Sequence, residues 1–199
     1  MSTAERAVCT PEQLLELSDG DLYELIDGQL VERKMSVLSS WVAGETYGRI
    51  RDFLRDTGQG GWAFPEGTSY QCFPWDAGAV RRADASYIAP GRFDNDEVPE
   101  RGHLRIAPDL AAEVVSPHDS FNEVDQKVED FLEAGVRLVW VISPETQSVQ
   151  VYRPGVQATR RLHGDDELDG EDVLSGFRCK VSELFPSRAT VADRDARQA

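Results

Sequence analysis

Two acidic residues, Asp84 and Glu113, interrupt apolar stretches of the chain and are the first candidates for chemistry. Asp84 lies within VRRADASYI and Glu113 within LAAEVVSP, and each stretch is typical of a β-strand. A buried carboxylate needs a partner because its desolvation is costly, and two on neighbouring strands repel each other unless a cation lies between them. We therefore expect Asp84, Glu113 and the carbonyl oxygen of Val114 to hold Mg²⁺ or Mn²⁺, which prefer oxygen ligands.

Lys127 is one of only three lysines and follows the Glu113 segment directly. The residues from Ser120 to Ala134 predict a helix, with a capping box at the start, an apolar stripe and a closing Gly135. Lys127 falls at the edge of that stripe, so its long side chain can extend toward the end of the preceding strand. There its ammonium group would orient an attacking water or stabilise charge developing on a phosphate.

The elements that must position these residues predict an α/β domain. The apolar run VRLVWVI is typical of a strand buried on both faces, and the alternating SVQVYR is expected to pair antiparallel with it. A strand, a helix and a second strand in this order imply a right-handed crossover and a parallel pair. Upstream, the sequence predicts a short helix from Thr10, a hairpin turning at Asp27-Gly28, and an amphipathic helix over 39–57 that ends at Gly58.

Length and composition favour one domain in 199 residues, with boundaries at 10–186, a flexible N-terminus at 1–9 and a disordered C-terminal tail at 187–199. Residues 92–103 are polar and acidic and predict an exposed loop. No apolar run approaches the roughly 18–20 residues of a membrane helix, and the N-terminus lacks a secretory signal pattern. A cytoplasmic protein with no membrane partner is expected.

The net charge of −15 argues against a protein that coats nucleic acid through a broad basic surface. Arginines nevertheless gather locally, and the candidates for contacts with a nucleic-acid backbone are Arg49, Arg51, Arg55, Arg81 and Arg82. The three cysteines are far apart and odd in number, so they form neither a disulfide framework nor a zinc pattern.

The runs YELIDGQLVE, RRADASYI, APDLAAEVVSPHDSFNEVDQKVEDFLEAGVRLVWVISPETQSVQVYRP and GDDELDGEDVLSGFRCKVSELF resemble the Uma-type bacterial restriction-endonuclease family. That family is assigned to the PD-(D/E)XK nuclease superfamily, and the resemblance covers residues 10–186. It implies a restriction-endonuclease-like fold, with a central mixed β-sheet flanked by helices and one metal-centred site. Asp84 then corresponds to the motif aspartate and Glu113 to the acid of the (D/E)XK element.

Two positions depart from the family pattern. Ala83 replaces the proline before the aspartate, and Val115 occupies the lysine position two residues after the acid. The resemblance implies that Lys127 supplies the missing lysine from the following helix. It also implies a role for Glu24, in YELID, as an additional metal ligand or general base.

Simpler interpretations remain open for three of the four residues. Asp84 could pair with a neighbouring arginine, Arg81 or Arg82, Lys127 could be a solvated helix residue paired with Glu123 or Asp130, and Glu24 could point outward from the hairpin.

The expected function is a Mg²⁺- or Mn²⁺-dependent endodeoxyribonuclease that acts on DNA, with a homodimer as one arrangement for cutting two strands. The alternative is a catalytically inactive nuclease-fold domain that serves as a binding or assembly module. A weaker third interpretation is a hydrolase of a phosphoester outside nucleic acids.

Overall fold

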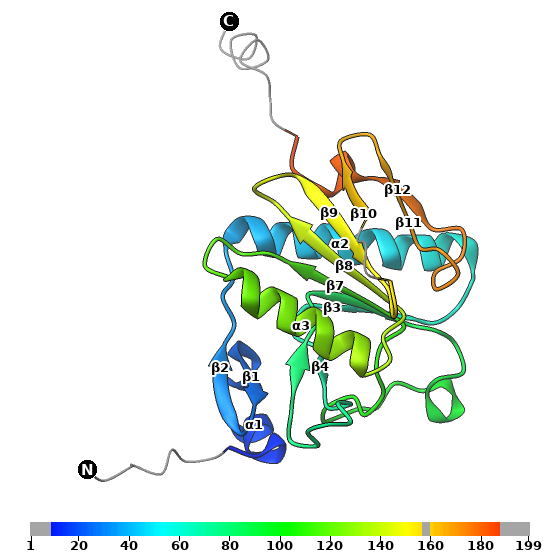
Figure 1. Cartoon of the computed structure of the whole chain (residues 1–199). Helices are drawn as coiled ribbons and strands as arrows, with labels where there is room; N and C mark the ends of the chain where they lie inside the picture. Colours follow the sequence, from blue (N-terminus) through cyan, green and yellow to red (C-terminus); the bar gives the residue numbers. More distant parts are fainter. Residues whose placement is uncertain (1–8, 157–159, 188–199) are drawn as a thin grey trace, which may run out of the picture.

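The computed structural model describes residues 9–156 and 160–187 (Figure 1). The termini predicted to be flexible or disordered, 1–9 and 187–199, lie outside the described residues except for residues 9 and 187. Across the described ranges, no helix combines the length and the apolar character needed to cross a membrane.

The N-terminal elements form a small unit beside the central sheet. Helix α1 (Pro11–Glu16) starts from the predicted capping box at Thr10 and leads through a short 3-10 turn, η1 (Gly20–Leu22), into a hairpin. Strands β1 (Tyr23–Ile26) and β2 (Gln29–Glu32) pair antiparallel across Asp27 and Gly28, which both have positive φ as a tight hairpin turn requires. The predicted hairpin is confirmed.

Helix α2 (Val37–Thr57) covers one face of the central sheet. It ends at Gly58, in the left-handed conformation, as predicted, but begins two residues before the expected start because Ser36 forms a capping box with Ser39. Its buried face includes Val42 and Ile50.

The central sheet has six strands in the order β10-β9-β8-β7-β6-β3 (Figure 1). Strands β7 and β8 are parallel and all other neighbours are antiparallel, so the sheet is mixed, as expected. The bounds are β3 (Trp62–Pro65), β6 (Ala85–Ile88), β7 (Leu110–Val114), β8 (Leu138–Ser143), β9 (Ser148–Tyr152) and β10 (Arg160–His163).

Helix α3 (Phe121–Glu133) connects β7 to β8 and covers the sheet face opposite α2. It starts from the predicted capping box at Ser120, and Gly135 follows with positive φ. Val128 and Phe131 pack with Ala111 of β7, whereas the next residue, Ala112, packs on the α2 side. Because side chains alternate along a strand, Glu113 points to the α3 side with Ala111.

The stretch predicted as one strand, VRRADASYI, is divided in the structure. Strand β5 (Arg81–Arg82) pairs with β4 (Ser69–Tyr70), and only β6 joins the central sheet. Asp84 therefore lies in the bend between β5 and β6 and not within a strand, where its N–H donates to the carbonyl of Ala112. The sequence pattern alone does not locate such a break, because the two arginines of β5 and the residues of β6 are both compatible with one extended strand.

The remaining elements lie in the loop at 92–103 and in the C-terminal part. They are η2 (Asp94–Asp96), β11 (Glu167–Asp169), β12 (Arg178–Lys180) and η3 (Val181–Leu184).

Candidate functional site

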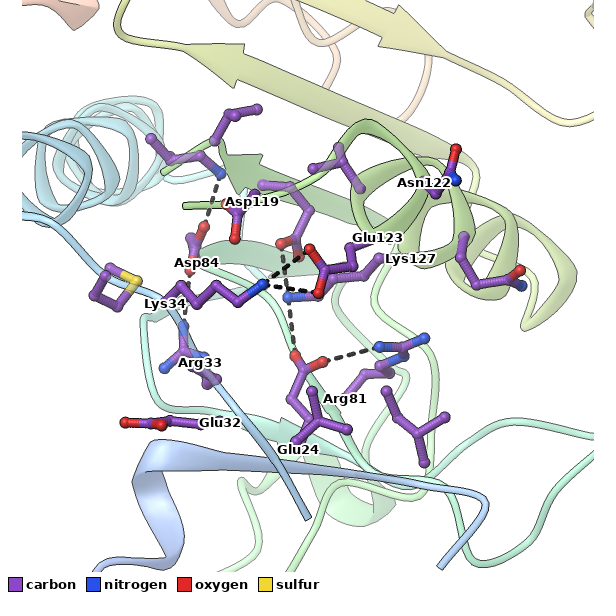
Figure 2. Close-up of a pocket in the computed structure, with 18 residues that line it drawn as sticks. Glu24, Glu32, Arg33, Lys34, Arg81, Asp84, Asp119, Asn122, Glu123 and Lys127 are labelled. Carbon is purple, nitrogen blue, oxygen red and sulfur yellow. Dashed lines mark hydrogen bonds and ion pairs between the residues drawn. The ribbon is translucent and has the colours of Figure 1, made fainter. Parts of the chain in front are cut away.

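A pocket of about 420 Å³ lies where the β1–β2 hairpin and the linker to α2 meet the end of β7 and the first turns of α3 (Figure 2). The four residues predicted to be catalytic all line it: Glu24, Asp84, Glu113 and Lys127. They come from β1, the β5–β6 bend, β7 and α3, so the fold gathers in one place residues that are far apart in the sequence.

Glu113 is almost completely buried near the end of β7. Its Oε2 lies 2.7 Å from Lys127 Nζ, whereas Oε1 is buried with no hydrogen-bond partner. Burial, together with the nearby carboxylates of Asp84 and Glu24, raises the pKa of Glu113 to about 8, although Lys127 opposes the shift. Glu113 is therefore a carboxyl group with one oxygen still lacking a partner.

Asp84 is held at the end of β7 through both of its oxygens. Oδ2 accepts a hydrogen bond from the N–H of Val114 at 2.7 Å, and Oδ1 lies 2.8 Å from the guanidinium of Arg33 (Figure 2). The ion-pair partner of Asp84 is thus Arg33 and not one of its neighbours in sequence, Arg81 or Arg82.

Lys127 reaches from α3 into the pocket and bridges two acids. Its Nζ lies 2.8 Å from Glu24 Oε1 and 2.7 Å from Glu113 Oε2. Burial opposes its charge, but the surrounding carboxylates outweigh burial and raise the pKa of Lys127 above its usual value. Lys127 is therefore a charged ammonium group and not the solvated residue of the simpler interpretation.

Glu24 is buried beneath the pocket and does not point outward from the hairpin. Oε1 also accepts the N–H of Arg82, and Oε2 lies 3.0 Å from the guanidinium of Arg81. Burial disfavours its ionisation, but Lys127 and Arg81 outweigh burial and lower the pKa of Glu24 to about 2. A carboxylate with this pKa and with both oxygens engaged is a weak general base.

The largely buried charged groups of this region almost pair off. Arg33 pairs with Asp84, Lys127 with Glu24, and Arg81 with both Glu24 and Asp130. Three largely buried cations thus face three carboxylates, and Glu113 is the surplus one. A further cation beside Glu113 would complete the balance.

The donor set fits Mg²⁺ or Mn²⁺. Within the described part of the chain, no three His, Cys, Asp or Glu side chains are grouped so as to hold a metal ion by themselves. Mg²⁺, however, is commonly bound through one or two carboxylates, with waters and substrate phosphate as its other ligands. Asp84 and the unpartnered Oε1 of Glu113 meet that requirement, with hard oxygen donors at a pocket wall.

The arginines predicted to contact nucleic acid are not gathered into one basic face at the pocket. On α2, all three are ion-paired: Arg49 with Glu45 and Glu183, Arg51 with Asp52, and Arg55 with Asp52 and Asp56. None of these three lines the pocket.

The other two predicted contacts, Arg81 and Arg82, are buried. Arg81 holds two carboxylates, and Arg82 donates to backbone carbonyls of Tyr23, Gly20 and Gly67. In this conformation both guanidinium groups are used inside the protein.

Two pocket-lining residues of the linker between β2 and α2, Arg33 and Lys34, were not predicted from the sequence. A signal was present, because two adjacent cations follow the hairpin directly in a strongly acidic chain with few lysines. Asp130, the second partner of Arg81, was considered only as a neighbour of Lys127.

The chain matches known proteins at the level of family and structure. It is similar over most of its length to a crystal structure titled as a "putative nuclease belonging to DUF820" from Anabaena variabilis, with 25% identity and a TM-score of 0.73. That match covers 88% of this chain and 97% of the other. Among curated proteins, none matches.

The structural match supports the predicted restriction-endonuclease-like fold, a central mixed sheet flanked by helices. The model of the Uma2 family, described as "Putative restriction endonuclease", matches residues 11–182 and thus includes all four predicted catalytic residues. The chain therefore belongs to the Uma2 family.

Proposed function

We propose that the protein is a Mg²⁺- or Mn²⁺-dependent endonuclease that hydrolyses phosphodiester bonds in DNA. Asp84 and Glu113 are the metal ligands in this proposal, and Lys127 assists. The observation that carries it is the surplus carboxylate of Glu113, with a buried unpartnered oxygen and a raised pKa, facing a pocket that Asp84 and Lys127 also line. Membership of the Uma2 family supports a nuclease over other phosphoester hydrolases.

Each residue has a separate task. A bound divalent cation would supply Lewis-acid polarisation of the scissile phosphate. The hydrogen bond from Val114 fixes Asp84, and the ion pair with Lys127 fixes Glu113, so both ligands are oriented before substrate arrives. Lys127 keeps its proton and stabilises negative charge that develops at the phosphate. Glu24 is a positioning residue, because it holds Lys127 and Arg81 in place.

Net charge links substrate binding at the site to a bound cation. With Glu113 ionised and no metal bound, the buried paired groups leave one excess negative charge, and the carboxylates of Glu32 and Asp119 also line the pocket. One divalent cation offsets two of these negative charges and so lowers the repulsion of a phosphodiester. This dependence of substrate attraction on the cation would let a strongly acidic protein act on DNA.

The test is nicking of supercoiled plasmid with Mn²⁺ and then Mg²⁺, comparing wild type with Glu113→Gln and Asp84→Asn. Arg178→Gln is the matched control, since Arg178 lies on β12 in an exposed ion pair with Glu167. We expect nicking in wild type and the control and its loss in both site variants. Equal nicking by all four proteins would identify a contaminant or a different site.

A second candidate is the binding or assembly module without catalysis. Arg33 already neutralises Asp84, and a protonated Glu113 would leave the site balanced with no metal. If that candidate holds, neither Mn²⁺ nor Mg²⁺ supports nicking, and neither ion raises the melting temperature.

A further inference from the structure

Two adjacent cations, Arg33 and Lys34, form ion pairs across the pocket with acids of other elements. Arg33 Nη2 lies 2.8 Å from Asp84 Oδ1, at the β5–β6 bend. Lys34 Nζ lies 2.8 and 2.9 Å from the two carboxylate oxygens of Glu123, in the first turn of α3 (Figure 2). The linker between β2 and α2 is thus tied to two other walls of the pocket by ion pairs.

These two cations differ from the others at the pocket in how firmly they are engaged. Lys127 and Arg81 each contact two buried carboxylates, and the proposed reaction leaves those contacts in place. Arg33, by contrast, shares Asp84 with the proposed metal. Its other acidic contact, Glu66, is more distant at 3.6 Å and partly exposed.

Lys34 is also free to exchange its partner. Its ion pair with Glu123 is exposed, and pairs of this kind contribute little to stability. Glu123 has a second interaction of its own, because Oε2 accepts the N–H of Ser120 in the helix cap. Glu123 therefore remains hydrogen-bonded when Lys34 moves to another anion.

We propose that Arg33 and Lys34 bind the substrate phosphate, and that the Arg33–Asp84 ion pair makes cation and phosphodiester bind cooperatively. A divalent ion at Asp84 displaces Arg33 from that carboxylate. The Arg33 side chain is only 9% exposed and would then keep only its longer contact with Glu66, so its guanidinium can take a further anion, and a phosphodiester suits its forked geometry. This inference rests on the proposed function, because it takes Asp84 to be the metal ligand.

The experiment measures Ca²⁺ binding by calorimetry with and without a short DNA duplex, which is checked for integrity afterwards. Ca²⁺ serves as the probe because it takes the same oxygen ligands. The coupling is the dissociation constant of Ca²⁺ without the duplex divided by that with the duplex. By linkage, the dissociation constant of the duplex must change by the same factor when Ca²⁺ is added. For wild type we expect roughly tenfold tighter binding of each ligand in the presence of the other.

The variants separate the two cations. Arg33→Gln is expected to reduce the coupling several-fold, to the part that the charge of the cation itself supplies, while binding Ca²⁺ alone no more weakly, since Asp84 is released. Lys34→Gln is expected to weaken duplex binding while keeping the coupling. Arg178→Gln and Lys180→Gln, which remove exposed paired cations on β12, are the controls and should match wild type.

Coupling in Arg33→Gln equal to that of wild type, or no coupling in wild type, overturns the inference. If Arg33→Gln does not fold, Arg33→Lys takes its place, and its coupling should fall several-fold because an ammonium lacks the guanidinium fork. Coupling in Arg33→Lys equal to that of wild type would then overturn it.

Plasmid nicking tells the two proposals apart. Coupling without nicking overturns the proposed nuclease activity and leaves the role of Arg33 supported. Nicking together with unchanged coupling in Arg33→Gln overturns only the role of Arg33.

Discussion

Lys127 and Glu113 form an ion pair with 2.7 Å between Nζ and Oε2, although one comes from a helix and the other from the strand before it. The (D/E)XK pattern places its lysine two residues after the acid, where this chain has Val115. The ion pair brings an ammonium group to the acid from α3 instead. It occupies one oxygen of Glu113 and leaves the other without a partner.

The first prediction concerns pH and stability. The pKa of Glu113 is about 8 in the folded protein, above its ordinary value of 4.5, so the folded state binds more protons than the unfolded state between these values. Stability attributable to Glu113 is therefore full below pH 4.5 and falls as pH rises toward 8, by at most about 1.4 kcal/mol per pH unit. Urea unfolding at several pH values should show this fall in wild type and its absence in Glu113→Gln. Parallel pH profiles for the two proteins would contradict the prediction.

The second prediction concerns removal of the bridging lysine. Lys127→Met leaves Glu113 without its cation and deprives Glu24 of one of its two, so we expect a loss of about 3–5 kcal/mol in the free energy of unfolding. At a pH well above 8, where Glu113 ionises, adding Glu113→Gln should recover part of that loss, because the stranded carboxylate is then gone. Denaturant titration of the single and double variants measures both effects. A double variant no more stable than Lys127→Met would show that the loss has another origin.

The third prediction concerns the divalent cation. An ion that binds only the folded protein should stabilise it by about 2.7 kcal/mol at a concentration a hundred times its dissociation constant. Mn²⁺ should therefore raise the melting temperature of wild type but not of Asp84→Asn. Mg²⁺ should act in the same direction. A rise of equal size in Asp84→Asn would place the ion elsewhere.

The fourth prediction concerns the contribution of the buried Arg81 to stability. Arg81 neutralises Glu24 and Asp130 inside the protein, so Arg81→Met should cost about 3–5 kcal/mol in unfolding free energy. Arg137→Met is the matched control, because Arg137 and its partner Asp172 are exposed. Its loss should be no more than about 1 kcal/mol. Equal stability of the two variants would contradict the assignment.

Local sequence signals were sufficient to predict most of the fold. Helix starts were marked by capping boxes at Thr10 and Ser120, and the parallel pair by two apolar runs flanking a helix. The break at Asp84 was missed, because it depends on β5 leaving the central sheet to pair with β4. Tertiary contacts decide which sheet β5 joins, and the residue pattern does not show where the strand is divided.

The sequence predicted which acidic residues and which lysine form the candidate site, but not all of the ion pairs among its residues. Isolated acids in apolar segments identified Asp84 and Glu113, the position of Lys127 at the edge of the helix stripe indicated that residue, and the resemblance to a family added Glu24. The partner of Asp84 could not be found this way, since Arg33 is 51 positions away and meets it only through the packing of the hairpin linker. The burial of Arg81 and Arg82 likewise depends on tertiary packing and could not be predicted from the local sequence.

The position of the Glu24 hairpin near the start of this sequence means that its partners in the site are synthesised after it. Glu24 leaves the ribosome early, whereas Arg81, Glu113 and Lys127 follow much later. A nascent chain that ends before α3 has no Lys127, so the ammonium that holds Glu113 and Glu24 is absent. The assembled site of the described structure thus exists only in chains synthesised past α3, and a truncated product that ends earlier cannot form it.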